Sequence, residues 1–86
     1  MSLDIKTRQS GDITVLDLTG RITLGEGTGA LRDNFKKELA GGGQRFIFNM
    51  SGVSYMDSAG LGELVGCRAS AANSGAKLCL AGLQKK

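Results

Sequence analysis

The first part of the chain shows the alternation of apolar and polar residues that is typical of β-strands. Residues 3–8 (Leu-Asp-Ile-Lys-Thr-Arg) alternate strictly, and residues 13–18 (Ile-Thr-Val-Leu-Asp-Leu) are apolar enough for a more central strand. Between them, Ser10-Gly11-Asp12 has the composition of a turn. Together these segments predict an N-terminal β-hairpin.

The rest of the chain alternates helical and strand patterns. Leu31, Phe35 and Leu39 repeat at four-residue spacing among charged residues, which predicts an amphipathic helix of roughly three to four turns that ends at glycines 41–43. Residues 45–50 and 77–81 are apolar and predict buried strands, and residues 61–73 predict a second helix. The apolar face expected for this second helix consists of Leu61, Leu64, Val65, Arg68 or Ala69, and Ala72.

The resulting order, β-β-α-β-α-β, predicts a single α/β domain over residues 1–86. After the hairpin, strands that alternate with helices pair in parallel through right-handed crossovers, so both helices lie on one face of a mixed sheet of about four to five strands. The other face of the sheet is expected to be open or thinly covered.

Composition and charge narrow the classes of partner. The chain has 86 residues and a net charge of +3, and its basic residues are scattered without interleaved aromatic residues, which argues against a nucleic-acid partner. No apolar run approaches the roughly 20 residues that span a membrane, and no signal peptide is evident, so we expect a cytoplasmic protein without a membrane partner. Cys67 and Cys79 form no metal-binding pattern and are expected to be buried, reduced thiols.

Asp57 and Ser58 lie at a predicted strand-to-helix junction and are the main candidates for function. Their oxygens suit a helix cap, and the Ser58 hydroxyl at the positive end of a helix is also well placed to carry a phosphate. The sequence contains no His, so a Ser-His-Asp triad is excluded, and we expect neither a metal nor a catalytic site. Both interpretations of the pair, cap and modification site, stay open, and an enzyme is not expected.

Glycine-rich stretches add two weaker signals. Residues 25–30 (Gly-Glu-Gly-Thr-Gly-Ala) fit a dinucleotide fingerprint, but the preceding strand belongs to a hairpin and no acidic residue ends a strand about twenty positions later. A flexible entry to the helix is the favoured interpretation, and no cofactor is expected. Gly60, Gly62 and Gly66 either leave bare backbone for another protein or let the second helix pack closely on the sheet.

Residues 57–64 (Asp-Ser-Ala-Gly-Leu-Gly-Glu-Leu), preceded by residues 51–53 (Ser-Gly-Val), resemble the core motif of STAS domains, and most closely that of bacterial anti-sigma-factor antagonists. Residues 16–22 and 75–83 are similar to other signature stretches of that family. The resemblance implies a partner switch. The antagonist binds an anti-sigma factor that is also a GHKL-type serine kinase, and a sigma factor is released.

In that scheme the kinase phosphorylates the motif serine and ends the binding, and a PP2C-type phosphatase reverses the modification. The resemblance places the phosphorylation on Ser58 and the partner-binding surface at the start of the second helix and the loop around residues 20–25. The residues carried over to that surface are Asp57, Ser58, Ala59, Gly60, Gly62, Arg21 and Thr23. The alternative is a STAS adaptor in an ABC lipid-transport complex or a signalling scaffold without a sigma factor.

Three departures from the family pattern bear on these expectations. Thr23 and Asn49 stand where antagonists often have Asp, so a charged contact with the kinase is in doubt. The usual C-terminal helix is missing after the last predicted strand. A sheet left uncovered in this way predicts self-association as a homodimer.

Overall fold

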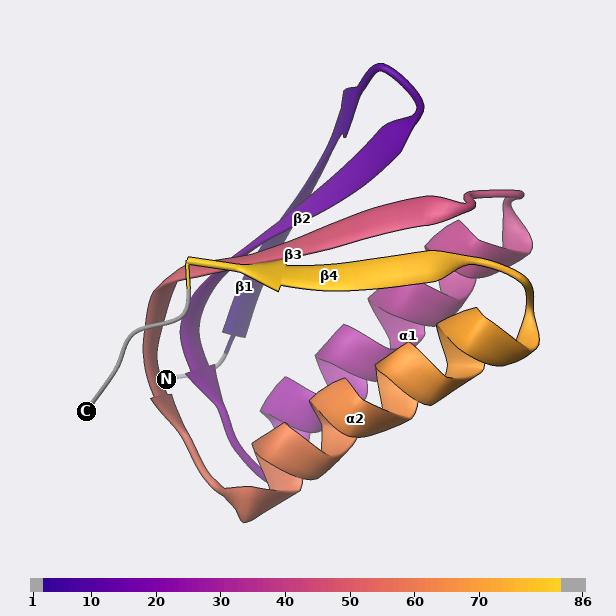
Figure 1. The fold of residues 1–86 in the computed structure, drawn as a ribbon. Coiled ribbons are helices and arrows are strands. Elements are labelled where there is room, and N and C mark those ends of the chain that lie inside the picture. The colour runs from indigo at the N-terminus through magenta and orange to yellow at the C-terminus, as the bar shows by residue number, and fades with distance from the viewer. Residues whose placement is uncertain (1–2, 83–86) are drawn as a thin grey trace.

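A computed structural model describes residues 3–82, apart from the side chain of Glu26, as one sheet with two helices packed on it (Figure 1). The strands are β1 (Leu3–Ser10), β2 (Ile13–Ile22), β3 (Arg45–Met56) and β4 (Lys77–Ala81), and the helices are α1 (Glu26–Ala40) and α2 (Ser58–Asn73). The four strands lie in the order β1-β2-β3-β4, with β1 antiparallel to β2 and the other pairs parallel. The predicted hairpin, mixed sheet and one-sided helical layer are confirmed. Within residues 3–82 there is no third helix.

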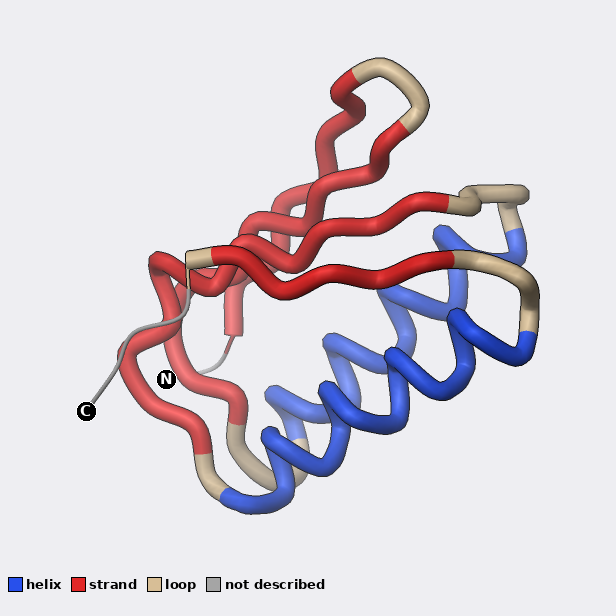
Figure 2. The backbone as a smooth tube through the Cα atoms, in the orientation of Figure 1, coloured by secondary structure: helices blue, strands red, loops and turns tan. Residues whose placement is uncertain are grey.

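Strands β2 and β3 are longer than the pattern of residues predicts. They stay paired as far as Ile22 and Met56, with register shifts after Asp17 and after Gly20. Figure 2 shows that this extension curves out of the sheet toward the starts of the two helices. Such bulges bend and twist a strand pair, and the small residues at these shifts resemble turn residues in the sequence. The predicted strand ends at residues 18 and 50 were therefore wrong.

Both helices begin earlier than their apolar repeats. Helix α1 begins at Glu26, after Gly25 with a φ of 101°, a conformation that side chains disfavour. Helix α2 begins at Ser58 instead of residue 61. Glycines and alanines carry no amphipathic signal, so the first turn of each helix is invisible to periodicity.

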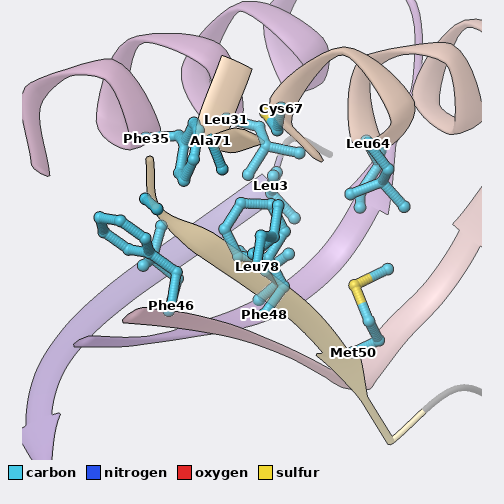
Figure 3. Close-up of a cluster of buried hydrophobic side chains, with 14 residues drawn as sticks. Leu3, Leu31, Phe35, Phe46, Phe48, Met50, Leu64, Cys67, Ala71 and Leu78 are labelled. Carbon is cyan, nitrogen blue, oxygen red and sulfur yellow. The ribbon is translucent and has the colours of Figure 1, made fainter. Parts of the chain in front are cut away.

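Three phenylalanines form the centre of the core between the sheet and the helices (Figure 3). The Phe35 ring on α1 makes edge-to-face contacts with Phe46 and Phe48 on β3, with centroid distances of 5.0 and 5.5 Å. Leu16 from β2 and Leu31 from α1 are completely buried beside them. This cluster holds α1 over the middle of the sheet, and burial of each large side chain contributes about 1.5–3 kcal/mol.

Helix α2 faces the sheet with a different side from the predicted one. Its buried residues are Gly60, Leu64, Cys67 and Ala71. Only Leu64 of the predicted apolar face is buried, and the remaining members, Leu61, Val65, Arg68, Ala69 and Ala72, are exposed. Small residues on the inner face let the helix approach the sheet closely, whereas the periodicity of the larger apolar residues indicated the wrong orientation.

The sheet face opposite the helices carries a polar network at its centre. Asp17 accepts hydrogen bonds from Arg8 Nε (2.7 Å) and from Asn49 Nδ2 (2.9 Å), and these two donors, Arg8 first, hold the pKa of Asp17 below its usual range. Cys79 is exposed, so the expectation of a buried thiol was wrong for it, although it is right for Cys67. In the part of the chain that the structure describes, no helix is long and apolar enough to cross a membrane.

Candidate functional site

Asp57 caps the N-terminus of α2 at its junction with β3. Its backbone is extended (φ −92°, ψ −176°), and its Oδ1 accepts a hydrogen bond from the N–H of Gly60 at 2.8 Å. This bond satisfies one of the N–H groups that the first helical turn leaves without a partner inside the helix. The cap interpretation of the Asp57-Ser58 pair therefore applies to Asp57.

The same carboxylate also ties α2 to the loop that follows β2. Asp57 Oδ2 accepts from the N–H of Leu24 at 3.1 Å, and the Asp57 N–H donates to the Ile22 carbonyl at 3.3 Å. The Gly60 N–H, followed by that of Leu24, holds the pKa of Asp57 below its usual range. Asp57 is therefore ionised at neutral pH and acts as a positioning residue for both segments.

Two glycines bring both helix starts against the end of β2. A β-carbon on Gly60 would overlap the Ile22 carbonyl oxygen and lie 2.8 Å from Met56 Cγ. One on Gly27, in the first turn of α1, would lie 2.9 Å from the Arg21 carbonyl oxygen. Real β-carbons essentially never approach backbone atoms this closely. Close packing thus explains Gly60, and the helix starts converge at one end of the sheet, as Figure 2 shows.

Ser58 is the first residue of α2, and it is exposed. Helical spacing places it on the same side of α2 as Leu61, Gly62 and Val65. Leu61 and Val65 are 54% and 62% exposed, and Leu24, which the hydrogen bond to Asp57 holds next to this helix end, is 78% exposed. We call these five residues the Ser58 face.

The Ser58 face combines a neutral hydroxyl with apolar side chains and bare backbone. A β-carbon on Gly62 would meet no atom within 4 Å, so close packing does not explain this glycine as it explains Gly60. Among residues 3–82, no hydrogen bond engages the Ser58 hydroxyl. Large apolar side chains exposed together are typical of a surface that binds another protein.

The other residues predicted for the partner-binding surface lie in varied environments. Ala59 is half-buried, and Gly60 is buried, which corrects its expected place on the surface. The guanidinium of Arg21 lies 5.5 Å from the ring centroid of Tyr55, on the paired extension of β2 and β3. Thr23 is half-buried, and its carbonyl accepts the Thr28 N–H at 3.1 Å.

The sequence analysis expected the loop around residues 20–25 on the partner-binding surface but did not single out Leu24 within it. It assigned Leu61 and Val65 to the buried face of α2. The available signal was weak: an apolar residue in a loop of small and polar residues, and more apolar residues on α2 than one face can bury. Neither signal indicates by itself which apolar residues face the solvent. The structure assigns them through the inward packing of Gly60 and Leu64.

The glycine-rich loop before α1 is engaged in internal contacts. The Thr28 hydroxyl, on a buried side chain, accepts from the Gly25 N–H and donates to the Gly25 carbonyl, both at 3.2 Å. The Thr28 N–H also donates to the Thr23 carbonyl. Because these polar groups already have internal partners, the glycine-rich stretch is better explained as an entry to the helix than as a phosphate-binding loop.

The groove between the helices, about 260 Å³ in volume, is bridged by an ion pair between Arg32 and Glu63 at 2.8 Å. Cys67 lies at its base, where burial, followed by the Glu63 carboxylate, raises the pKa of the thiol to about 12. This thiol is therefore protonated and unreactive at neutral pH. Among residues 3–82, no three His, Cys, Asp or Glu side chains gather closely enough to hold a metal ion.

Solved structures with a similar fold include two anti-sigma-factor antagonists. A putative anti-sigma-factor antagonist from Thermotoga maritima has a TM-score of 0.85 and 22% identity, covering 95% of this chain and 70% of that one. SpoIIAA in its unphosphorylated form has a TM-score of 0.78 and 18% identity, covering 95% of this chain and 76% of that one.

The fold also matches part of a much longer protein, Mglu, with a TM-score of 0.77 and 21% identity. That match covers 87% of this chain but only 18% of Mglu. A search of curated protein sequences gave no significant match. At these identities the structural matches establish the fold.

The sequence also matches a family model directly. The model of the STAS domain matches residues 4–86, which is nearly the whole chain. The match includes the Asp57-Ser58 junction, both helices and the four strands. The chain therefore belongs to the STAS domain family.

Proposed function

We propose that this STAS domain is an anti-sigma-factor antagonist whose partner is an anti-sigma factor with GHKL-type serine kinase activity. In this proposal the unphosphorylated domain binds the anti-sigma factor through the Ser58 face and so releases a sigma factor. The observation that carries the proposal is the position of Ser58, an exposed hydroxyl among the exposed apolar side chains of Leu24, Leu61 and Val65. The domain itself is not an enzyme in this proposal.

A neutral serine suits such a surface, and a phosphoserine does not. Burial of the apolar side chains favours binding by about 25 cal/mol per Å² of apolar surface, and a hydroxyl adds little cost if the partner supplies a hydrogen bond. Phosphorylation would add a charge of about −1.5 to −2 at neutral pH. Placed in the same contact, this charge would lose its hydration without an internal partner to replace it.

The surroundings of Ser58 also support a switch over an internally stabilised phosphate. The carboxylate of Asp57, the preceding residue, is held ionised and would repel the phosphate. The Gly60 N–H in the first helical turn already donates to that carboxylate. The helix N-terminus therefore stabilises a phosphate on Ser58 less than a helix end with free N–H groups would. In the proposal, a PP2C-type phosphatase removes the phosphate and so restores the form that binds the anti-sigma factor.

The test starts with capture of partners from cells of the source organism by three forms of the domain: wild type, Ser58→Ala and Ser58→Asp. Wild type and Ser58→Ala are expected to retain a kinase-type anti-sigma factor, and Ser58→Asp to bind it roughly tenfold or more weakly in calorimetry with the purified partner. When ATP is added, the captured kinase should transfer one phosphate to Ser58 of the wild type, and mass spectrometry locates the modified residue.

The matched control is Ser54→Ala, because Ser54 is also an exposed serine but donates its hydroxyl to the Gly20 carbonyl at 3.1 Å. This variant should still be phosphorylated and should still bind. Phosphate on Ser51 or Ser54 in place of Ser58 would contradict the site. Equal affinity of wild type and Ser58→Asp would contradict the switch.

A second candidate function is a STAS adaptor in an ABC lipid-transport complex or a signalling scaffold. It is supported by the occurrence of the same fold within 18% of the much longer Mglu chain, since such a domain can serve as one part of a larger assembly. In that case Ser58 is a contact residue without a kinase. The same capture experiment separates the two functions, because an adaptor would retain transport or scaffold proteins and would stay unphosphorylated with ATP.

A further inference from the structure

The peptide unit between Thr23 and Leu24 is held at its two ends by different helices. Its carbonyl, on Thr23, accepts the N–H of Thr28 in the first turn of α1 at 3.1 Å. Its N–H, on Leu24, donates to Oδ2 of Asp57, the N-cap of α2, also at 3.1 Å. The loop after β2 therefore joins the starts of both helices through one peptide unit and one carboxylate.

The position of Leu24 depends on these main-chain bonds, because its side chain contributes little. The side chain is 78% exposed, and it belongs neither to the core nor to the apolar residues that pack against the core. On the α1 side, Thr28 also fixes the next residue, since the Gly25 N–H donates to its hydroxyl at 3.2 Å. On the α2 side, the hydrogen bond to Asp57 holds Leu24 in the Ser58 face.

Of these two hydrogen bonds that the Asp57 carboxylate accepts, the one from Leu24 is the easier to break. It is 3.1 Å long and exposed to solvent, whereas the bond from the Gly60 N–H is 2.8 Å long and partly buried. Water replaces a lost partner at low cost at an exposed N–H, and at higher cost at a partly buried one. A disturbance of the carboxylate therefore breaks the bond to Leu24 before it breaks the helix cap.

A phosphate on Ser58 is a disturbance of this kind. Ser58 follows Asp57 directly in the chain, and a phosphate on its hydroxyl brings a charge of about −1.5 to −2 beside the carboxylate at neutral pH. Like charges repel, so the phosphate favours an arrangement in which the carboxylate turns away and gives up one of its bonds.

We propose that phosphorylation of Ser58 releases Leu24: the phosphate displaces the Asp57 carboxylate from the Leu24 N–H, and Leu24 loses its fixed place in the Ser58 face. This inference rests on the proposed function and adds a second effect to it. The partner then meets a repelling charge and must also order Leu24 when it binds. The ordering of one main-chain residue and its side chain lowers the affinity roughly fivefold or more.

The release of Leu24 can be measured without a partner, on the whole 86-residue chain with phosphoserine built in at position 58 during synthesis. In the unmodified chain, ¹⁵N relaxation should give the Leu24 N–H an order parameter near the roughly 0.85 of a rigid backbone. In the phosphorylated chain this value should fall toward the range below about 0.6 that marks a flexible one, while Thr28 and Gly60 stay rigid. A Leu24 N–H that stays rigid after phosphorylation, held by Asp57 or by the phosphate itself, would overturn the proposal.

Asp57→Asn separates the loss of the bond from the charge of the phosphate. Asparagine keeps one oxygen, which can cap the Gly60 N–H, but its NH₂ group cannot accept a bond from Leu24. This variant should loosen Leu24 without any phosphate, and phosphoserine at position 58 should then loosen it no further. A rigid Leu24 in Asp57→Asn would show that another contact holds it and would equally overturn the proposal.

The matched control for added charge is phosphoserine at position 10. Ser10 is exposed and lies at the turn of the β1–β2 hairpin, at the opposite end of β2 from Leu24. The same charge placed there should leave the Leu24 order parameter at the unmodified value. If it loosens Leu24 as much as the phosphate on Ser58 does, the effect does not pass through Asp57 and the proposal is wrong.

Calorimetry with the captured anti-sigma factor distinguishes this inference from the proposed function. Asp57→Asn should bind the partner roughly fivefold more weakly than wild type, and the chain with phosphoserine at position 58 more weakly still. If that phosphoserine loosens Leu24 and leaves the affinity unchanged, the proposed switch fails and the release of Leu24 stands. If it abolishes binding while Leu24 stays rigid, the switch stands and the release fails. Circular dichroism checks folding, and if Asp57→Asn unfolds, the phosphorylated chain still decides.

Discussion

The two sides of helix α2 are built from the same residue types and have opposite environments. On the inner side, Leu64 is 4% exposed and Gly60 packs against the Ile22 carbonyl. On the outer side, Leu61 is 54% exposed, and Gly62 has open space where a β-carbon would lie. Leu64 and Gly60 thus pack in the interior of the fold, whereas Leu61 and Gly62 belong to the Ser58 face.

In the proposed function, one helix serves stability on its inner side and partner binding on its outer side. The inner side uses small residues to place the helix start against β2, which fixes the position of Ser58. The outer side accepts exposed apolar area and a glycine that weakens the helix by roughly 0.5–1 kcal/mol relative to Ala. Exposed apolar area and a weakening glycine do nothing for the folded chain alone, so the contrast supports a binding role for the outer side.

The largest expected difference is in the loss of stability when Leu64 or Leu61 is replaced by alanine. Leu64→Ala should lower the free energy of unfolding by about 2–5 kcal/mol, because it leaves a cavity beneath α2, whereas Leu61→Ala should change it by less than about 0.5 kcal/mol. Urea unfolding of both variants measures these values. Leu61→Ala should instead weaken binding to the captured partner roughly tenfold. Equal losses of stability would show that Leu61 is buried in solution and would remove the contrast.

The two glycines should respond with opposite signs. Gly60→Ala should destabilise the domain by about 1–3 kcal/mol or more, because the added methyl group meets the Ile22 backbone, which cannot move aside easily. Gly62→Ala should stabilise it by about 0.5–1 kcal/mol through the better helix propensity of Ala. Thermal unfolding followed by circular dichroism compares them. If Gly62→Ala also weakens partner binding while stabilising the fold, bare backbone is needed in the contact; unchanged binding would restrict the contact to the side chains.

The smallest expected effect concerns the Asp57 cap, which ties the start of α2 to the loop after β2. Asp57→Ala should lower Tm by roughly 4–8 °C at neutral pH, since the cap and the tie to Leu24 are both lost. The pKa of Asp57 is lowered in the folded state, so its charge stabilises the fold above its ordinary pKa of about 3.9, and this contribution is lost as the pH falls through the folded value. The difference in Tm between wild type and Asp57→Asn should therefore shrink on acidification.

Asp33→Asn is the control for that pH series, because Asp33 is exposed on α1 and is not among the groups that hydrogen-bond to Asp57. Its Tm should follow that of the wild type over the whole range. A difference between wild type and Asp57→Asn that stays constant down to low pH would show that the charge of Asp57 does not contribute to the cap.

Much of the fold could be predicted because it rests on local patterns. The alternation over residues 3–8 and 13–18 is confirmed as β1 and β2, and the repeat of Leu31, Phe35 and Leu39 as α1. These patterns arise from hydrophobic burial at the period of each element. The Asp57-Ser58 junction was predicted from another local signal, because Asp and Ser are favoured before a helix, where their oxygens accept from its free N–H groups.

What the sequence determined by itself is the order of the elements, the layers and the family motif around Ser58. Only the tertiary structure decided which side of α2 is buried, how far β2 and β3 extend together, and that Cys79 is exposed. The reason is that α2 has more apolar residues than one side can bury. The contact of Gly60 with the Ile22 carbonyl, between residues far apart in the chain, selects the side that packs, and this selection places Ser58 on the outside.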